Sequence, residues 1–163
     1  MKKPWCLLIL FNVILLCISW VMAVYAYPRL PMEMPLWLNF CGQPVIKMQK
    51  SLIFFLYPVI QSLFNLCFLL VYGVRPLFKK ISYKDLVYLN QKKKKLLGEL
   101  KKEIVFLALI FFNLIFIHIH RSLILLAHEV EKGVEPKYFY SIFVIIIILI
   151  PYYHMRKRMI LKK

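Results

Sequence analysis

The residues best suited to chemistry gather in one stretch of this sequence, HIHRSLILLAHE at residues 118–129. Histidines at such spacing could bind a metal ion or respond to pH. His118 and His120, however, point about 160° apart on a regular helix, so the two rings cannot bind one ion, and Arg121 repels cations. We therefore expect no metal and no cofactor. We interpret this group, together with Asn113 and His128, as a polar cap that faces the outer loops, with a pH switch as the alternative.

A second polar group lies within two long apolar stretches. Its members, called the polar stripe below, are Asn12, Ser19, Pro58, Gln61, Ser62 and Asn65. Amides in lipid need hydrogen-bond partners, so the two helices should meet along the sides that carry these residues. Asn12 lies early in the first helix and should pair with Asn65, which lies late in an antiparallel second helix. We interpret the stripe as packing between helices. A substrate or ion path is the alternative, although no span holds a carboxylate that could bind a cation.

The elements that position these residues follow from the composition. The chain of 163 residues is 62% hydrophobic and only 18% charged, which requires lipid as a solvent. Two charge-free runs, 5–27 and 51–74, exceed the roughly 20 residues of a membrane-spanning helix. Two more spans are predicted at 104–127, whose charge-free part ends at His120, and at 138–155. We expect an all-α integral membrane four-helix bundle. A cleaved signal peptide is the alternative to a retained first span.

The distribution of basic residues predicts the orientation in the membrane. Seventeen Lys and Arg residues fall in the N-terminal tail, in the connector 75–103 and in the basic tail 156–163, against five in the two opposite connectors. Because short basic loops stay in the cytoplasm, both termini and the middle connector are predicted to be cytoplasmic. This topology accounts for the net charge of +16, and we expect no nucleic-acid partner.

The connector 75–103 contains a predicted basic amphipathic helix at residues 82–102. Ser82 and Asp85 resemble a helix-start signal, and the following leucines share one side of the helix while most lysines point elsewhere. We expect this helix to lie on the inner leaflet, attracted by anionic lipid, and to lead into the third span. Docking of a cytoplasmic protein partner is the alternative.

The outer connector YPRLPMEMPLWLNFCGQP, at residues 27–44, holds four of the nine prolines. Proline excludes a continuous helix over the first part of this segment, and Asn39 with Gly42 marks a turn. So many apolar residues in an exposed link predict a compact cover that folds onto the outer ends of the helices. A recognition surface for an extracytoplasmic ligand is the alternative. Its candidate residues are Pro31, Pro35, Trp37, Asn39, Gly42, Pro44 and Lys50.

The same residues carry a family resemblance. The spacing Leu30-Pro31-x-x-x-Pro35, then Asn39, Gly42-x-Pro44 and Lys50 before an apolar span, resembles a domain of unknown function at the N-terminus of bacterial SdpI-like immunity and signalling proteins. The resemblance covers residues 5–73 as a helix–loop–helix unit. The family carries a histidine soon after the second proline, where this sequence has Leu36 and Trp37. The resemblance implies a place in the bacterial inner membrane and protection against, or signalling of, a secreted toxin.

These observations favour a non-enzymatic multi-pass membrane protein in the cell membrane, whose outer loop senses or gives immunity to an extracytoplasmic peptide-like ligand. A Ser/His/Asp arrangement and a CxxC motif are both missing from the sequence, which argues against an enzyme. The alternative is a transport or membrane-complex assembly subunit, in which Gln61 and Asn65 would line a water-accessible path.

Overall fold

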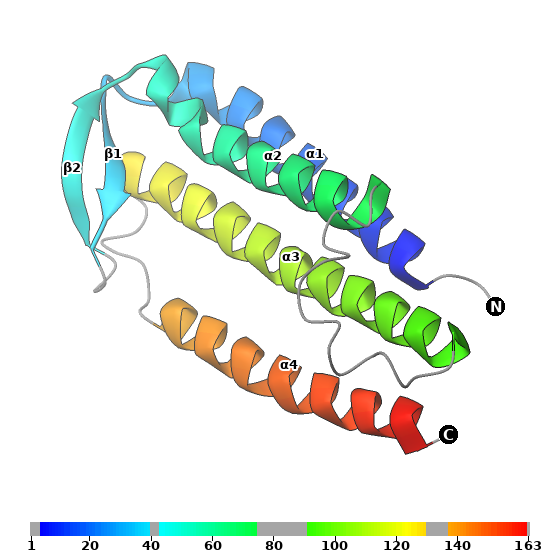
Figure 1. The fold of residues 1–163 in the computed structure, drawn as a ribbon. Helices are drawn as coiled ribbons and strands as arrows, with labels where there is room; N and C mark the ends of the chain where they lie inside the picture. The colour runs from blue at the N-terminus through cyan, green and yellow to red at the C-terminus, as the bar shows by residue number, and fades with distance from the viewer. Residues whose placement is uncertain (1–3, 40–42, 75–90, 130–136, 163) are drawn as a thin grey trace.

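The computed structural model describes residues 4–39, 43–74, 91–129 and 137–162. Four helices alternate in direction along the chain: α1 (Pro4–Ala26), α2 (Leu56–Phe68), α3 (Gln91–Ala127) and α4 (Lys137–Lys162). In Figure 1, α1 begins and α4 ends at one end of the bundle, and a small β-hairpin covers the opposite end. The predicted helical bundle is confirmed.

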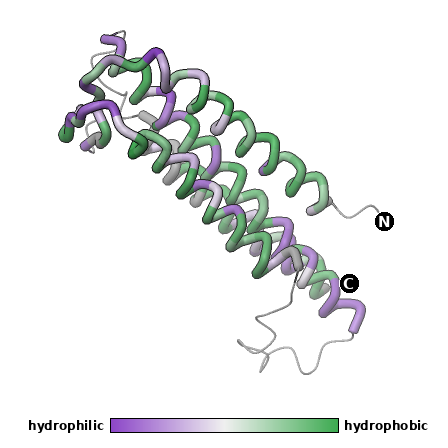
Figure 2. Tube along the Cα trace, turned by 90° about the horizontal axis from the view of Figure 1, so that it is seen from above, coloured by the Kyte–Doolittle hydropathy of each residue, from purple (hydrophilic) through white to green (hydrophobic). Residues whose placement is uncertain are grey.

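Three helical segments are long and apolar enough to cross a membrane, namely Trp5–Arg29, Leu52–Tyr72 and Gln91–Ala127. The first and third segments contain the predicted spans 5–27 and 104–127, and the second lies within the predicted span 51–74. The segment in α2 is lengthened by a 3-10 turn before it (η2, Leu52–Phe55) and by a π-helical segment after it (η3, Leu69–Val74). Hydrophobic residues dominate the length of the bundle, while hydrophilic ones gather at its two ends (Figure 2). The fourth predicted span, 138–155, lies within α4 and stays a prediction.

The core lies where α1, α2 and α3 meet. On α1 the buried positions recur every three or four residues, which puts them on one side of the helix: Asn12, Leu15, Ser19, Ala23 and Ala26. Several of these side chains are small, so the backbones of α1 and α3 can approach closely. The rest of α1 is largely exposed in the isolated chain, as expected for a helix that faces lipid on its other sides.

The third helix corrects the prediction of a separate helix on the inner leaflet. Helix α3 runs without a break for 37 residues from Gln91, so residues 91–102 are its first three turns. This stretch has no proline that would end the helix. Gly98 lowers the stability of the helix by only about 1 kcal/mol relative to alanine, and the helix continues through it. Leu97 and Leu100 are buried on the side that also carries Lys93 and Glu103. The predicted start at residues 82–90 lies outside the described residues.

The outer connector contains a β-hairpin that the all-α expectation did not include. Strand β1 (Glu33–Leu38) pairs antiparallel with β2 (Pro44–Gln49), and the register runs from Glu33 opposite Gln49 to Leu38 opposite Pro44. The pairing is irregular on both sides of Trp37. A 3-10 turn, η1 (Tyr27–Arg29), links α1 to this hairpin. The predicted compact cover therefore exists, but as paired strands.

The fourth helix is held mainly by α3. Glu103 of α3 accepts a hydrogen bond of 3.2 Å from the Tyr152 hydroxyl and lies 3.9 Å from the Arg156 guanidinium. The Lys93 ammonium donates to the carbonyl of Leu161, 3.0 Å away, in the last turn of α4. A cation there is favourable because the C-terminal carbonyls of a helix carry partial negative charge.

Candidate functional site

Four side-chain amides from α1, α2 and α3 meet in the middle of the bundle. The Asn113 amide nitrogen donates to Asn12 Oδ1 at 2.7 Å and to Asn65 Oδ1 at 3.1 Å. The Asn113 oxygen accepts from Asn65 Nδ2 at 2.8 Å and from Gln61 Nε2 at 3.0 Å. We call Asn12, Gln61, Asn65 and Asn113 the amide cluster, and Asn113 is its hub.

The amide cluster both supports and corrects the sequence analysis. As predicted, polar stripe residues of the first two helices face one another inside the bundle. The predicted direct pair of Asn12 with Asn65 is wrong, because Asn113 lies between them and bonds to both. The predicted outer polar cap includes Asn113, but this residue is fully buried at the amide cluster. Its spacing from Phe106, Leu109 and His120 on one side of α3 is the signal that could have shown this.

The other members of the stripe pack beside the cluster. Ser62 accepts a hydrogen bond from Trp20 Nε1 at 3.0 Å and donates to the carbonyl of Pro58 at 2.7 Å. Ser19 is buried, and its hydroxyl has no hydrogen-bond partner among the described residues. The indole bond adds a second polar link between α1 and α2.

The chemistry of the amide cluster is that of a structural joint. An amide offers both donors and acceptors, so the four side chains can bond to one another without any charged group. Gln61 Oε1 is the exception in the cluster, since it is buried and has no partner among the described residues. Asn12 also donates to the carbonyls of Leu8 and Phe106, at 2.8 Å and 3.1 Å. Because lipid offers no competing partners, breaking this network leaves polar groups unpaired in an apolar setting. The cluster therefore fixes the rotation of three helices relative to one another.

A groove of about 330 Å³ runs beside the cluster between the three helices. Its polar lining comes from Asn12, Ser62 and Asn65, and apolar side chains form the rest. These three polar side chains already bond within the protein. The groove is therefore mainly an apolar recess.

The hairpin is fastened to the helices at two places. The Lys50 ammonium donates to the carbonyls of Pro28 and Leu30, at 3.0 Å and 3.1 Å, just after α1 ends. It also lies 5.3 Å from the centre of the Tyr27 ring. On the other strand, the Tyr57 hydroxyl donates to the carbonyl of Leu36 at 2.7 Å. Each strand thus has its own polar tie to the bundle.

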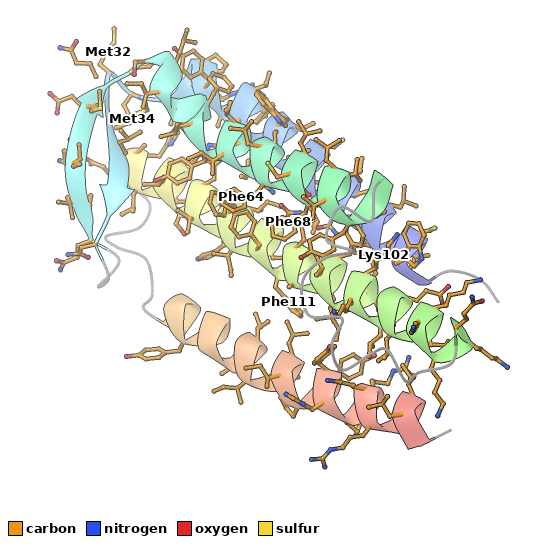
Figure 3. All side chains as sticks on the ribbon, in the orientation of Figure 1. Met32, Met34, Phe64, Phe68, Lys102 and Phe111 are labelled. Carbon is orange, nitrogen blue, oxygen red and sulfur yellow. The ribbon has the colours of Figure 1, made fainter. Side chains whose placement is uncertain are left out.

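An apolar contact completes this attachment. Met34 of β1 is only 1% exposed and packs into a cluster with Ala23, Ala26, Leu30, Phe54 and Ala127. Met32, two residues earlier, is 82% exposed. Figure 3 shows Met34 on the side of the hairpin that faces the helices and Met32 away from it. The hairpin therefore has one face in the core.

His120 in α3 and His128, just after the end of α3, have different settings. His120 is fully buried, with ring centres 4.6 Å from Phe54 and 5.8 Å from Tyr57, so the prediction that it belongs to an outer cap is wrong. Neither of its nitrogens has a hydrogen-bond partner among the described residues. His128 and Arg121 are exposed, and His128 Nε2 lies 3.1 Å from the carbonyl of Arg29. For His128, the predicted contact with the outer connector is confirmed.

The predicted recognition residues separate into structural and exposed positions. Pro35 is buried, Lys50 bonds to the segment just after α1, and Asn39 closes the turn by accepting from the Gln43 backbone at 2.8 Å. Trp37 lies on β1, Pro31 is half-buried before it, and Pro44 opens β2 in an exposed position. Gly42 lies outside the described residues. Most of these positions build the hairpin.

Strand β2 is an exposed part of this region, and of its residues only Pro44 was among the predicted recognition residues. From Pro44 to Lys47 every residue of β2 is exposed, including Val45 at 59% and Ile46 at 47%. Alternation of apolar and polar residues is too weak in PVIKMQ to have identified the strand. The structure thus offers a firmly held strand with an open side at the end of the bundle.

Comparison with known proteins gives one match. Residues 14–61 match a family described as a domain of unknown function, DUF1648. The matched segment holds most of α1, the whole hairpin and the start of α2, and thus both polar ties. No curated protein and no solved structure matches the chain. The chain is therefore a multi-pass membrane protein that carries a DUF1648 domain at residues 14–61.

Proposed function

We propose that this protein is a non-enzymatic membrane protein that binds an extracytoplasmic peptide-like ligand at its β-hairpin, and so senses that ligand or gives immunity to it. The observation that carries this proposal is the exposed strand β2 on a hairpin fastened to the bundle by Lys50 and Tyr57. A strand that is already ordered binds with a smaller loss of conformational entropy than a loose loop would.

Two further observations support the placement of the ligand. The excess of Lys and Arg in the tails and the middle connector favours a cytoplasmic location for them, and hence an extracytoplasmic hairpin. The hairpin also lies inside the matched domain, whose motif resembles that of SdpI-like immunity and signalling proteins. Together they favour a ligand that arrives from outside the cell.

The opposite end of the bundle supports contacts with the membrane surface and with a cytoplasmic partner. Lys92 and Lys95 are exposed in the first turns of α3, and Arg156 and Arg158 are exposed near the end of α4. Clustered cations at this level attract anionic lipid headgroups, and they could equally bind an acidic protein surface. A relay of ligand binding to a cytoplasmic protein would use this end.

The alternative, a transport or membrane-complex assembly subunit, has weaker support. Transport would use the polar stripe as a path, but Gln61 is fully buried and Asn65 is bonded to Gln61 and Asn113. Assembly would use the apolar groove beside Asn12 and Ser62. The bonded amides favour packing over a path.

Photocrosslinking tests the proposed function. A photoreactive amino acid would replace Val45 on the hairpin in the full chain, reconstituted in proteoliposomes and exposed to a biotinylated library of ten-residue peptides. We expect peptides to be captured at position 45. The matched control is Leu7, which is 65% exposed in α1 at the other end of the bundle. Equal capture at both positions, or none at 45, would refute peptide recognition by the hairpin.

A further inference from the structure

The backbone of the hairpin points to a mode of recognition, and this inference rests on the proposed function. We propose that the peptide binds as an additional β-strand along the free edge of β2. In this arrangement the backbone groups of Lys47 and Gln49 form the new hydrogen bonds, and an acidic side chain of the peptide lies beside Lys47.

The alternation of bonded and non-bonded pairs along the hairpin shows which backbone N–H and C=O groups of β2 point away from β1. The backbone nitrogen of Lys50 donates to the carbonyl of Met32 at 2.7 Å, so this pair belongs to the bonded positions of the ladder. Bonded and non-bonded pairs alternate in an antiparallel ladder, and Met34 faces Met48 two positions further along. Residues 48 and 50 therefore turn their backbone groups toward β1. Lys47 and Gln49 turn theirs toward the opposite, free edge.

This edge is open to another strand. Among the residues that the structure describes, the sheet has two strands, and β2 is the outer one, because β1 contacts α3 and lies between β2 and the helices (Figure 1). The inner edge is unsuited to strand addition, since β1 carries Pro35, which has no N–H. Pro35 faces Lys47 in a non-bonded pair, so its missing donor costs the ladder nothing. An unpaired edge of N–H and C=O groups is a template for one more strand.

Lys47 favours a foreign peptide over a second copy of this chain. If two copies paired symmetrically with Lys47 at the centre, the two Lys47 side chains would face each other, and with Met48 at the centre Lys47 would face Gln49. Neither arrangement gives Lys47 a carboxylate partner. Like charges directly opposite one another destabilise a strand pair, whereas a carboxylate opposite a lysine stabilises it. Lys47 is the sole charged residue of β2. The expected ligand is therefore an extended peptide with an acidic residue at the position that faces Lys47.

The probe for this inference is a fluorescent peptide, Thr-Val-Thr-Glu-Thr-Val-Thr, titrated onto the full chain in nanodiscs. Methylating the backbone nitrogens of its Val and Glu residues blocks one edge of the extended peptide, and methylating those of its Thr residues blocks the other. We expect one methylation set to weaken binding roughly tenfold and the other to leave it unchanged. Replacing Glu by Lys in the peptide should weaken binding about fivefold.

Variants of the protein provide an independent arm. Lys47→Pro and Gln49→Pro each remove an outward N–H and spare the ladder, so each should weaken binding of the unmethylated peptide about tenfold. Slow hydrogen exchange of the Lys50 amide would show that the hairpin is still formed. The matched controls are Lys47→Ala and Gln49→Ala, which change the same side chains but keep the backbone N–H groups. Gln49→Ala should bind the peptide like the wild type.

The outcomes separate the two proposals. Equal binding of both methylated peptides, with crosslinking still at position 45, would overturn strand addition and leave peptide recognition standing. Failure of the probe and of the peptide library alike would overturn both. A disulfide formed between two copies of a Lys47→Cys variant at low protein density would show that the edge pairs with a second copy instead.

Discussion

The hydroxyl of Tyr57 donates a hydrogen bond of 2.7 Å to the backbone carbonyl of Leu36, and so joins α2 directly to β1. The Tyr57 ring also stacks over buried His120 of α3, with ring centres 5.8 Å apart. One side chain therefore connects two helices and a strand. Because the hairpin has few other polar ties to α2, this residue controls how firmly the proposed binding strand is held.

Replacing Tyr57 by Phe should loosen the hairpin without disturbing the bundle. The ring stays in the core, and only the hydroxyl bond to the Leu36 carbonyl is lost. We expect the hairpin to open about 1 kcal/mol more readily, which is about fivefold faster exchange of its backbone amides. Hydrogen-exchange mass spectrometry in nanodiscs measures this. Tyr72→Phe, in the same membrane segment, is the control and should leave exchange of the hairpin unchanged.

Replacing Lys50 by Met should loosen the attachment of the hairpin at the end of β2. The ammonium group satisfies the carbonyls of Pro28 and Leu30, which no longer have a helical partner after α1 ends. We expect a loss of about 1 kcal/mol in the stability of the hairpin, discounted because the group is partly exposed. Lys47→Met, three residues earlier on β2 and without such a tie, serves as the control. Equal exchange rates in both variants would contradict a special role for Lys50.

Replacing Asn113 by Leu should destabilise the bundle more than any other single change in the amide cluster. The substitution removes the partner of Asn12, Gln61 and Asn65 at once. Unpaired buried amides cost of order 1–3 kcal/mol, although polar contacts in membranes average less, so we expect about 2 kcal/mol. Unfolding by steric trapping in bicelles would measure the change in free energy.

Two comparisons give that measurement a control. Leu114→Ala alters the exposed neighbour of Asn113 and should change stability by less than about 0.5 kcal/mol. A double-mutant cycle of Asn12→Ala with Asn113→Ala should show a coupling energy of about 1 kcal/mol. Additive effects in that cycle would mean that the two amides do not act together.

Replacing Glu103 by Ala should weaken the attachment of α4. The carboxylate accepts from Tyr152 and faces Arg156, so its loss removes both polar links at that level. The effect on overall stability should be small, about 0.5 kcal/mol, because the Arg156 side chain is half exposed. Crosslinking between cysteines placed in α3 and α4 would be slower in the variant. Glu99→Ala, one turn earlier, is the matched control.

Much of the architecture could be predicted because lipid imposes simple rules. Charge-free runs locate helices, and buried amides must find partners, so the long helices and the inward direction of Asn12, Gln61 and Asn65 followed from the sequence. The hub could not be assigned in this way. Asn113 also shares a side of α3 with polar residues nearer the outer end, and only the packing of α1 decides which of them is covered.

The hairpin illustrates the other limit. Prolines at positions 31, 35 and 44 correctly excluded a helix, but they are also unfavourable inside sheets. The structure accommodates Pro35 in a non-bonded position of β1, where no N–H is needed. Contacts such as that of Met34 with Ala23 and Phe54 then stabilise the strands. These contacts join residues distant in the sequence, and no local pattern records them.

Because α3 is one unbroken helix, it connects the hairpin end of the bundle to the opposite end as a single rigid element. At 1.5 Å per residue its 37 residues extend for about 55 Å. At one end Ala127 packs in the cluster that holds Met34 of the hairpin, and at the other Lys93 and Glu103 hold α4. We therefore expect a tilt imposed at the hairpin to appear as a displacement of Gln91 relative to α4. Distances between spin labels at residues 91 and 161 would measure that displacement. Unchanged distances on peptide binding would show that α3 does not move relative to α4.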